Sequence, residues 1–207
     1  MRIKELLFHN RGMRQTIAKN VFWLTLSQVG SRLIRALIII YAARILGAAE
    51  YGIFAYVLGF AGFFTLFADV GINPLLTRNT ANHPEQRTEY FSTSFWIKIV
   101  LLLATALLVI FVAPHFTNIE AAKALIPLVA LLVIFDGLRD FSIAFFRGLE
   151  KMEREALIVI VMNITIAVAG FIILSISPTA KSLILSYIAS VGASVILSVI
   201  ILRNQFL

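Results

Sequence analysis

Residues 156–202 read ALIVIVMNITIAVAGFIILSISPTAKSLILSYIASVGASVILSVIIL, and Lys181 is the one charged residue among them. This stretch is long enough for two helices of about 20 apolar residues, the length that crosses the hydrocarbon core of a bilayer. The rest of the chain is similar, because 60% of its 207 residues are hydrophobic and 14% are charged. So few polar residues cannot cover the surface of a soluble globular domain. The sequence therefore predicts an all-α polytopic membrane protein.

Four segments of this kind lack charged residues, and two further segments of the right length carry them. Together they predict a lobe of six transmembrane helices within residues 19–207, with spans at about 20–41, 51–76, 91–113, 124–146, 156–176 and 182–202. Gly47, Pro114 and Pro178 separate segments, whereas Pro74 indicates a kink or a helix start. We expect residues 1–18 to form a basic helix at the cytoplasmic interface of the membrane, and the alternative is a solvated tail.

Lysines and arginines are distributed unevenly over the alternate loops of this arrangement. Eleven fall in the segments on the side of the two chain ends, three fall in the opposite loops, and four lie inside predicted spans. Because cytoplasmic loops are enriched in Lys and Arg, we expect a multi-pass protein of the inner (cytoplasmic) membrane with both termini in the cytoplasm. This asymmetry accounts for the formal charge of +7, so no nucleic-acid partner is expected.

Three stretches lie at the ends of predicted spans: ARILGAAEYG at residues 43–52, DVGINPLLTR at 69–78 and FRGLEKMER at 146–154. Together they resemble the amino-terminal half of Wzx-type polysaccharide flippases, within the multidrug/oligosaccharidyl-lipid/polysaccharide exporter superfamily. The resemblance implies a six-helix lobe that faces a second lobe across a central cavity and works by alternating access. Members of this family usually carry both lobes. The second lobe expected here is a carboxy-terminal half or, in a homodimer, another copy of the chain.

The first span carries a polar stripe, since Gln28, Ser31, Arg32 and Arg35 fall within about a 100° arc of a helix. Two arginines near the middle of the membrane cost about 5–7 kcal/mol, which the apolar residues of the span barely offset. The stripe is therefore expected to face a cavity rather than lipid. Guanidinium groups make two-point contacts with phosphate, so a polyprenyl-phosphate-linked sugar is the expected ligand of Arg32 and Arg35. The alternative is structural pairing with a carboxylate, namely Asp69, Asp136 or Asp140.

The other charges inside predicted spans are fewer and less regular. Lys98 stands alone in the third span as a third candidate for binding the substrate, and the alternative is an ammonium that reaches toward the membrane interface. Asp136, Arg139 and Asp140 are spaced so that they meet on one helical face, which favours an internal ion pair. Asp69 is expected to tie the turn that follows the second span. These last four residues are the candidates for internal pairing or for ion coupling.

Two sets of small residues predict close packing between helices. The second span has Gly52, Ala55, Gly59 and Gly62 on one face, and the sixth span has a serine at every fourth position from Ser182 to Ser198. Both faces are expected to receive a neighbouring helix. For the serines we expect packing within the lobe, and a contact with a second lobe or a place in the cavity wall is the alternative.

The sequence contains no signature of catalysis or of cofactor binding. It has no Walker loop, no dinucleotide-binding glycine motif, no His-Glu-x-x-His and no cysteine. We therefore expect neither an enzyme nor a cofactor or metal, and the function indicated is flipping of a lipid-linked oligosaccharide or polysaccharide precursor. One alternative is a non-transporting membrane fragment or interaction subunit, in which every buried charge is paired internally. The other is a cation-coupled drug exporter, whose cationic ligands suit cavity arginines poorly.

Overall fold

A computed structural model describes residues 13–206, so the expected interfacial segment 1–18 lies largely outside the described residues. Residues 13–206 are helical and contain no strand. The long helices are α2 (Met13–Thr65), α3 (Ile72–Asn82), α4 (Arg87–Val112), α6 (Ile126–Gly148), α7 (Met152–Ile176) and α8 (Ala180–Phe206). The short helix α5 (Glu120–Lys123) and the 3-10 turns η1 (Pro84–Gln86) and η2 (Ala113–Phe116) lie in the connections.

Within the part of the chain that the structure describes, three segments are long and apolar enough to cross a membrane. They are Pro84–Phe116, Met152–Ile176 and Ala180–Arg203. The predicted all-α class is therefore confirmed, together with helices suited to a bilayer.

Helix α2 is interrupted at Gly47, where the sequence predicts a turn. The backbone there has φ 71° and ψ 177°, a conformation that residues with a Cβ rarely adopt. A second interruption falls inside the predicted span 51–76, because α2 ends at Thr65 and α3 begins at Ile72. Gly71 precedes α3 with φ 84°, and Pro74 occupies the first turn of α3, where its missing N–H costs no helical hydrogen bond. The apolar run therefore forms two helices separated by a break at residues 66–71.

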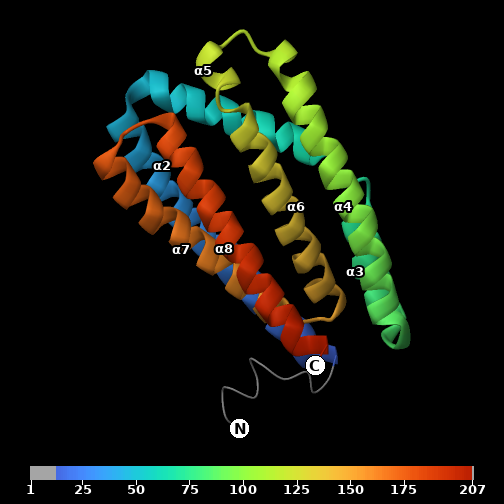
Figure 1. Cartoon of the computed structure of the whole chain (residues 1–207). Helices are drawn as coiled ribbons and strands as arrows, with labels where there is room; N and C mark the ends of the chain where they lie inside the picture. The colour runs from blue at the N-terminus through green and yellow to red at the C-terminus, as the bar shows by residue number, and fades with distance from the viewer. Residues whose placement is uncertain (1–12, 207) are drawn as a thin grey trace.

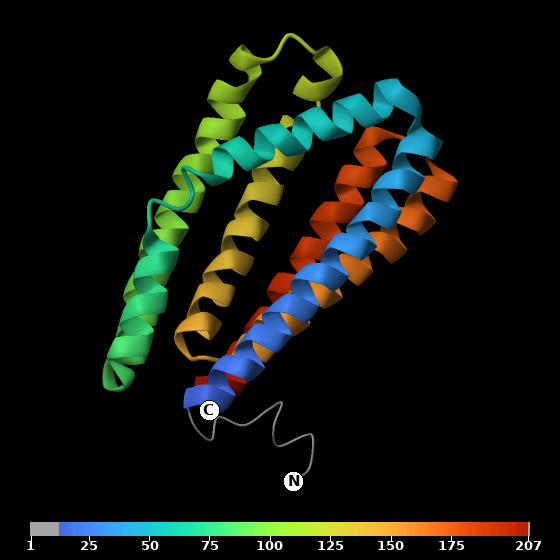
Figure 2. The same ribbon diagram turned by 180° about the vertical axis from the view of Figure 1, so that it is seen from behind.

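The long helices form two groups that share α6 (Figures 1 and 2). The first segment of α2 packs along α7 and α7 along α8, while α6 contacts α8 on one side and α3 and α4 on the other. Beyond Gly47, the second segment of α2 crosses from the first group toward α4 (Figure 2). Phe54, Val57, Ala61 and Phe64 anchor this crossing segment in the larger hydrophobic core. It covers the end of the bundle opposite the start of α2 and the end of α8 (Figure 1).

The serines of α8 pack inside the lobe. Ser186, Ser190, Ser194 and Ser198 have no exposed surface, and each hydroxyl donates to a carbonyl of its own helix, as Ser190 does to the Ser186 oxygen at 2.7 Å. The expectation of packing within the lobe is confirmed for these four. Because this surface is already covered, it is not available to a second lobe or copy.

The expected close approach to the glycine face of the second span is wrong. Apart from the adjacent backbone of the same helix, no heavy atom of residues 13–206 lies within 4 Å of a Cβ built at Gly52, Gly59 or Gly62. Close approaches occur instead at Gly137, Gly148 and Gly170. At Gly148, the last residue of α6, a built Cβ would lie 2.6 Å from Thr80 Cβ and 2.8 Å from the backbone oxygen of Thr77. A small-residue pattern on one helix does not show where a neighbour lies, because the neighbour's position depends on the connections between helices.

Candidate functional site

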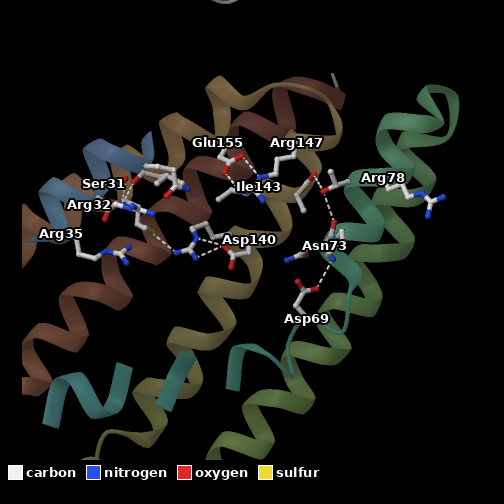
Figure 3. Close-up of a pocket in the computed structure, with 18 residues that line it drawn as sticks. Ser31, Arg32, Arg35, Asp69, Asn73, Arg78, Asp140, Ile143, Arg147 and Glu155 are labelled. Carbon is white, nitrogen blue, oxygen red and sulfur yellow. Dashed lines mark hydrogen bonds and ion pairs between the residues drawn. The ribbon is translucent and has the colours of Figure 1, made fainter. Parts of the chain in front are cut away.

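A cavity of about 940 Å³ lies between α2 and α7 on one side and α3 and α6 on the other (Figure 3). Most of its charged lining is cationic, with five arginines and three carboxylates: Arg32, Arg35, Arg78, Arg139, Arg147, Asp69, Asp140 and Glu155. The whole predicted stripe of the first span, from Gln28 to Arg35, lies in its wall. The helical spacing of the stripe therefore identified one side of the cavity.

Arg139 is neutralised by the two aspartates that share its helix. Its Nη1 lies 2.6 Å from Asp136 Oδ1, and its Nη2 donates to Asp140 Oδ1 at 2.8 Å. The internal pairing expected from their spacing is present. In addition, Arg139 Nη1 donates to the sulfur of Met162 on α7 at 3.0 Å, so this cluster also contacts the opposite side of the cavity.

A second ion pair closes the α6–α7 corner of the cavity. Arg147 Nε donates to Glu155 Oε2 at 2.7 Å, and Arg147 Nη2 donates to Glu155 Oε1. The Glu155 side chain is 2% exposed, whereas that of Arg147 is 47% exposed. The two hydrogen bonds from the Arg147 guanidinium thus give the Glu155 carboxylate a partner, without which it would be a buried, unpaired charge.

Arg32 and Arg35 differ from these arginines, because neither forms an ion pair or a hydrogen bond within the described residues. Both are exposed, and Arg35 extends from α2 toward the Asp140 side of the cavity (Figure 3). It also lines a smaller cavity of about 290 Å³ together with Asp136 and Arg139. The predicted alternative of direct pairing with a carboxylate is not found at these two positions.

Ser31 and Asn163 join the two helices behind the stripe. The Asn163 amide donates to Ser31 Oγ at 3.1 Å and to the Val159 carbonyl at 2.8 Å, and both side chains are buried. This contact ties α2 to α7. It fixes the rotation of α2 about its axis and thus the direction in which Arg32 and Arg35 project.

Lys98 does not lie with Arg32 and Arg35. Its ammonium donates to the Ala68 carbonyl at 2.7 Å and lies 3.7 Å from Asp69 Oδ1, and its side chain is 1% exposed. Asp69 Oδ1 in turn accepts the Asn73 N–H at 3.1 Å, the contact expected of a residue that ties this turn. Lys98 therefore faces the break between α2 and α3 and lines a separate cavity of about 200 Å³.

A family model described as polysaccharide biosynthesis protein matches residues 17–207. The chain belongs to this family. Comparisons with curated proteins and with solved structures each give no match. Membership confirms the resemblance indicated by residues 43–52, 69–78 and 146–154. It is consistent with a flippase role and agrees with a membrane location of this polysaccharide biosynthesis protein.

Two features of the cavity in this polysaccharide biosynthesis protein were missed by sequence reasoning. Glu155 was not considered as a partner of Arg147, although eight residues and one short turn separate them. Arg78 ends the stretch at residues 69–78 and has no place in the predicted stripe, yet it lies on α3 in the cavity wall, with its guanidinium directed away from the other labelled arginines (Figure 3). No group of three or more potential metal ligands occurs among the described residues.

Proposed function

We propose that this protein flips a lipid-linked oligosaccharide or polysaccharide precursor across the cytoplasmic membrane by alternating access, as one lobe of a two-lobe unit. The observation that carries the proposal is that Arg32 and Arg35, which form no ion pair or hydrogen bond within the described residues, lie in the wall of a cavity of about 940 Å³. A cavity of this size holds a ligand of several hundred daltons. The family description, polysaccharide biosynthesis, supports a sugar-containing ligand.

The chemistry of the cavity favours a phosphate-linked head group. Arg32 and Arg35 are three residues apart and thus neighbours on the helix surface, so both can contact one phosphate or diphosphate. Arginine forms parallel hydrogen bonds to two phosphate oxygens, and these charge-assisted bonds are stronger than bonds to neutral groups. The amide of Gln28 also lines the cavity and can form hydrogen bonds with a sugar. The lipid tail remains in the bilayer.

The position of the cavity supports an arrangement that opens to the cytoplasm. Its wall includes residues 139–147 of α6 and 155–163 of α7, on either side of the short α6–α7 turn. In the six-span arrangement that we propose, the basic residues assign this turn and both termini to the cytoplasm. The crossing segment of α2 covers the opposite end (Figure 2). Rocking against a second lobe then re-exposes the head group on the other side of the membrane.

The second lobe is a carboxy-terminal half or another copy of this chain. Arg32, Arg35 and Gln28 are exposed on the described chain, so one side of the binding site remains open to a partner. A substrate enclosed on both sides is what alternating access requires. The buried serines of α8 are not that partner surface.

Charge pairing separates this proposal from its alternatives. A non-transporting subunit predicts that every charge inside the lobe has an internal partner, and Arg32 and Arg35 depart from that prediction. A drug exporter with cationic ligands predicts an anionic cavity, whereas arginines outnumber carboxylates here. Lys98 contributes a further positive charge nearby, although its hydrogen bond to Ala68 makes it a less direct contact for substrate than the two arginines.

The test is translocation of a fluorescent polyprenyl-diphosphate-linked sugar in proteoliposomes that contain the intact assembly. The translocation rate is measured from the bleaching of the fluorophore by dithionite, which does not cross the membrane. We expect Arg35→Ala and Arg32→Ala to lower the translocation rate at least about tenfold, since each removes a charge-assisted hydrogen bond to the ligand. The matched control is Arg44→Ala, an exposed arginine of the same helix that lines none of the cavities described above. Normal translocation by both cavity variants, at normal expression and insertion, would refute the proposed role.

A further inference from the structure

We propose that Lys98 is a positioning residue, whose ammonium fastens the break between α2 and α3 and thereby sets the α3 wall of the cavity. The role of that wall in substrate transport rests on the proposed function above. The role of Lys98 in holding the break in place is independent of that function. Sequence reasoning placed Lys98 among the cations that bind substrate, whereas the geometry points to a contact with the protein's own backbone.

The break leaves backbone groups that need partners. After Thr65 the chain makes a tight turn, in which the Phe67 and Ala68 N–H groups donate to the Phe64 and Thr65 carbonyls at 3.0 and 3.2 Å. The last carbonyls of a helix lack donor partners within the helix. The Ala68 carbonyl lies in the turn, three residues beyond the end of α2, and Lys98 Nζ donates to it at 2.7 Å. A cation at the carboxyl end of a helix is also favoured by the helix dipole.

Burial makes this contact strong. The Lys98 side chain and Ala68 are each 1% exposed, and the nearest carboxylate, Asp69, lies 3.7 Å from the ammonium. An ammonium buried in this way is costly unless it is hydrogen-bonded and faces an opposite charge. Lys98 meets both conditions only while the turn at Ala68 and Asp69 stays where it is. The lysine and the break therefore stabilise each other.

The break lies between the crossing segment of α2 and helix α3, which are anchored at different places. The crossing segment of α2 packs on α8, where the rings of Phe54 and Tyr187 are 5.4 Å apart. Helix α3 is held to α6, because Thr77 Oγ1 donates to the Ala144 carbonyl at 2.9 Å. A change of angle at residues 66–71 thus moves α3 relative to the crossing segment. Such short, irregular segments are where hinges of domain closure are found.

The same turn reaches the cationic cavity. Asp69 and Asn73 line both the large cavity and the small one that holds Lys98, and Asp140 lines both as well. Asp140 is also the partner of Arg139. An anionic ligand that draws Arg139 away from Asp140 changes the charge that faces Lys98. The lysine is therefore placed to couple occupation of the cavity to the angle of the break.

Distances between spin labels test the positioning role directly, and the chain has no native cysteine to interfere. One label pair spans the break, at the exposed positions Ala55 and Ala81, and a reference pair lies on α7, at Leu157 and Val168. The full chain is measured in lipid nanodiscs without substrate. With Lys98→Met we expect a second distance across the break, with its population raised at least about tenfold, and an unchanged reference distance.

Two further variants keep the test decisive. Lys98→Arg retains a cationic donor and should preserve the distance across the break, whereas Asp69→Asn removes the facing charge and should broaden it. Thr105→Val, a buried position two turns further along α4, is the control for loss of a polar group without loss of charge. Distances in Lys98→Met that match the native ones would overturn the proposal, as would broadening in Thr105→Val of the same size. Since no substrate is present, failure of translocation for another reason leaves this result unaffected.

Discussion

A methyl group at Gly148 tests the packing of α3 against α6, on which one wall of the cavity depends. The Cβ of Gly148→Ala would lie 2.6 Å from Thr80 Cβ and 2.8 Å from the Thr77 carbonyl oxygen. That oxygen belongs to helix backbone, and the hydrogen bond from Thr77 Oγ1 to Ala144 holds α3 in place, so relief is limited. Overpacking of this kind costs about 1–3 kcal/mol, and the better helix propensity of alanine offsets at most about 1 kcal/mol.

We expect Gly148→Ala to lower the free energy of unfolding by about 1–2 kcal/mol and the Tm by about 2–8 °C. The assay is thermal unfolding of the purified full chain in a mild detergent, followed by the emission of its tryptophans. The matched control is Gly52→Ala, where the same methyl group meets no heavy atom within 4 Å and should leave the Tm unchanged or slightly higher. A Tm of Gly148→Ala equal to that of the native chain would show that α3 and α6 are not in close contact.

Two other substitutions probe the corner of the cavity and the break. Glu155→Gln removes the buried negative charge that pairs with Arg147, and it should lower the free energy of unfolding by about 1–3 kcal/mol in the same assay. The control is Glu120→Gln, whose side chain is 83% exposed and whose loss should change the stability little. Equal losses of stability in the two variants would contradict the buried ion pair. Gly71→Ala places a side chain on a residue whose backbone has φ 84°, and it should lower the free energy of unfolding by about 1–2 kcal/mol. An unchanged Tm would show that the break adopts another conformation.

Features of the site that depend on spacing along one helix were predictable from the sequence. The stripe from Gln28 to Arg35 lines the cavity because four residues within one arc of a helix share whatever that arc faces. Asp136, Arg139 and Asp140 form their ion pairs for the same reason. In both cases the helix alone brings the side chains together, so no knowledge of the tertiary fold was needed.

Features that join distant parts of the chain were not predictable in this way. Lys98 and Ala68 are 30 residues apart and meet through the fold of α4 against the break. The break was hidden by apolar residues that continue from the second segment of α2 into α3, although Gly71 and Pro74 marked it. Close packing at Gly148 likewise depends on where α3 lies, and the residue pattern of α6 alone does not predict that position.

The pairing of the other charges explains why Arg32 and Arg35 have no carboxylate partner among the residues that line the cavity. A carboxylate within reach would normally neutralise a guanidinium, and three carboxylates line the same cavity. Each of them already has a partner elsewhere in the protein: Asp140 faces Arg139, Glu155 faces Arg147, and Asp69 accepts the N–H of Asn73 and faces Lys98. Breaking one of these pairs to neutralise Arg35 would leave another buried charge without a partner, which is costly. The internal ion pairs thus preserve, on one face of α2, the free cations that an anionic ligand requires.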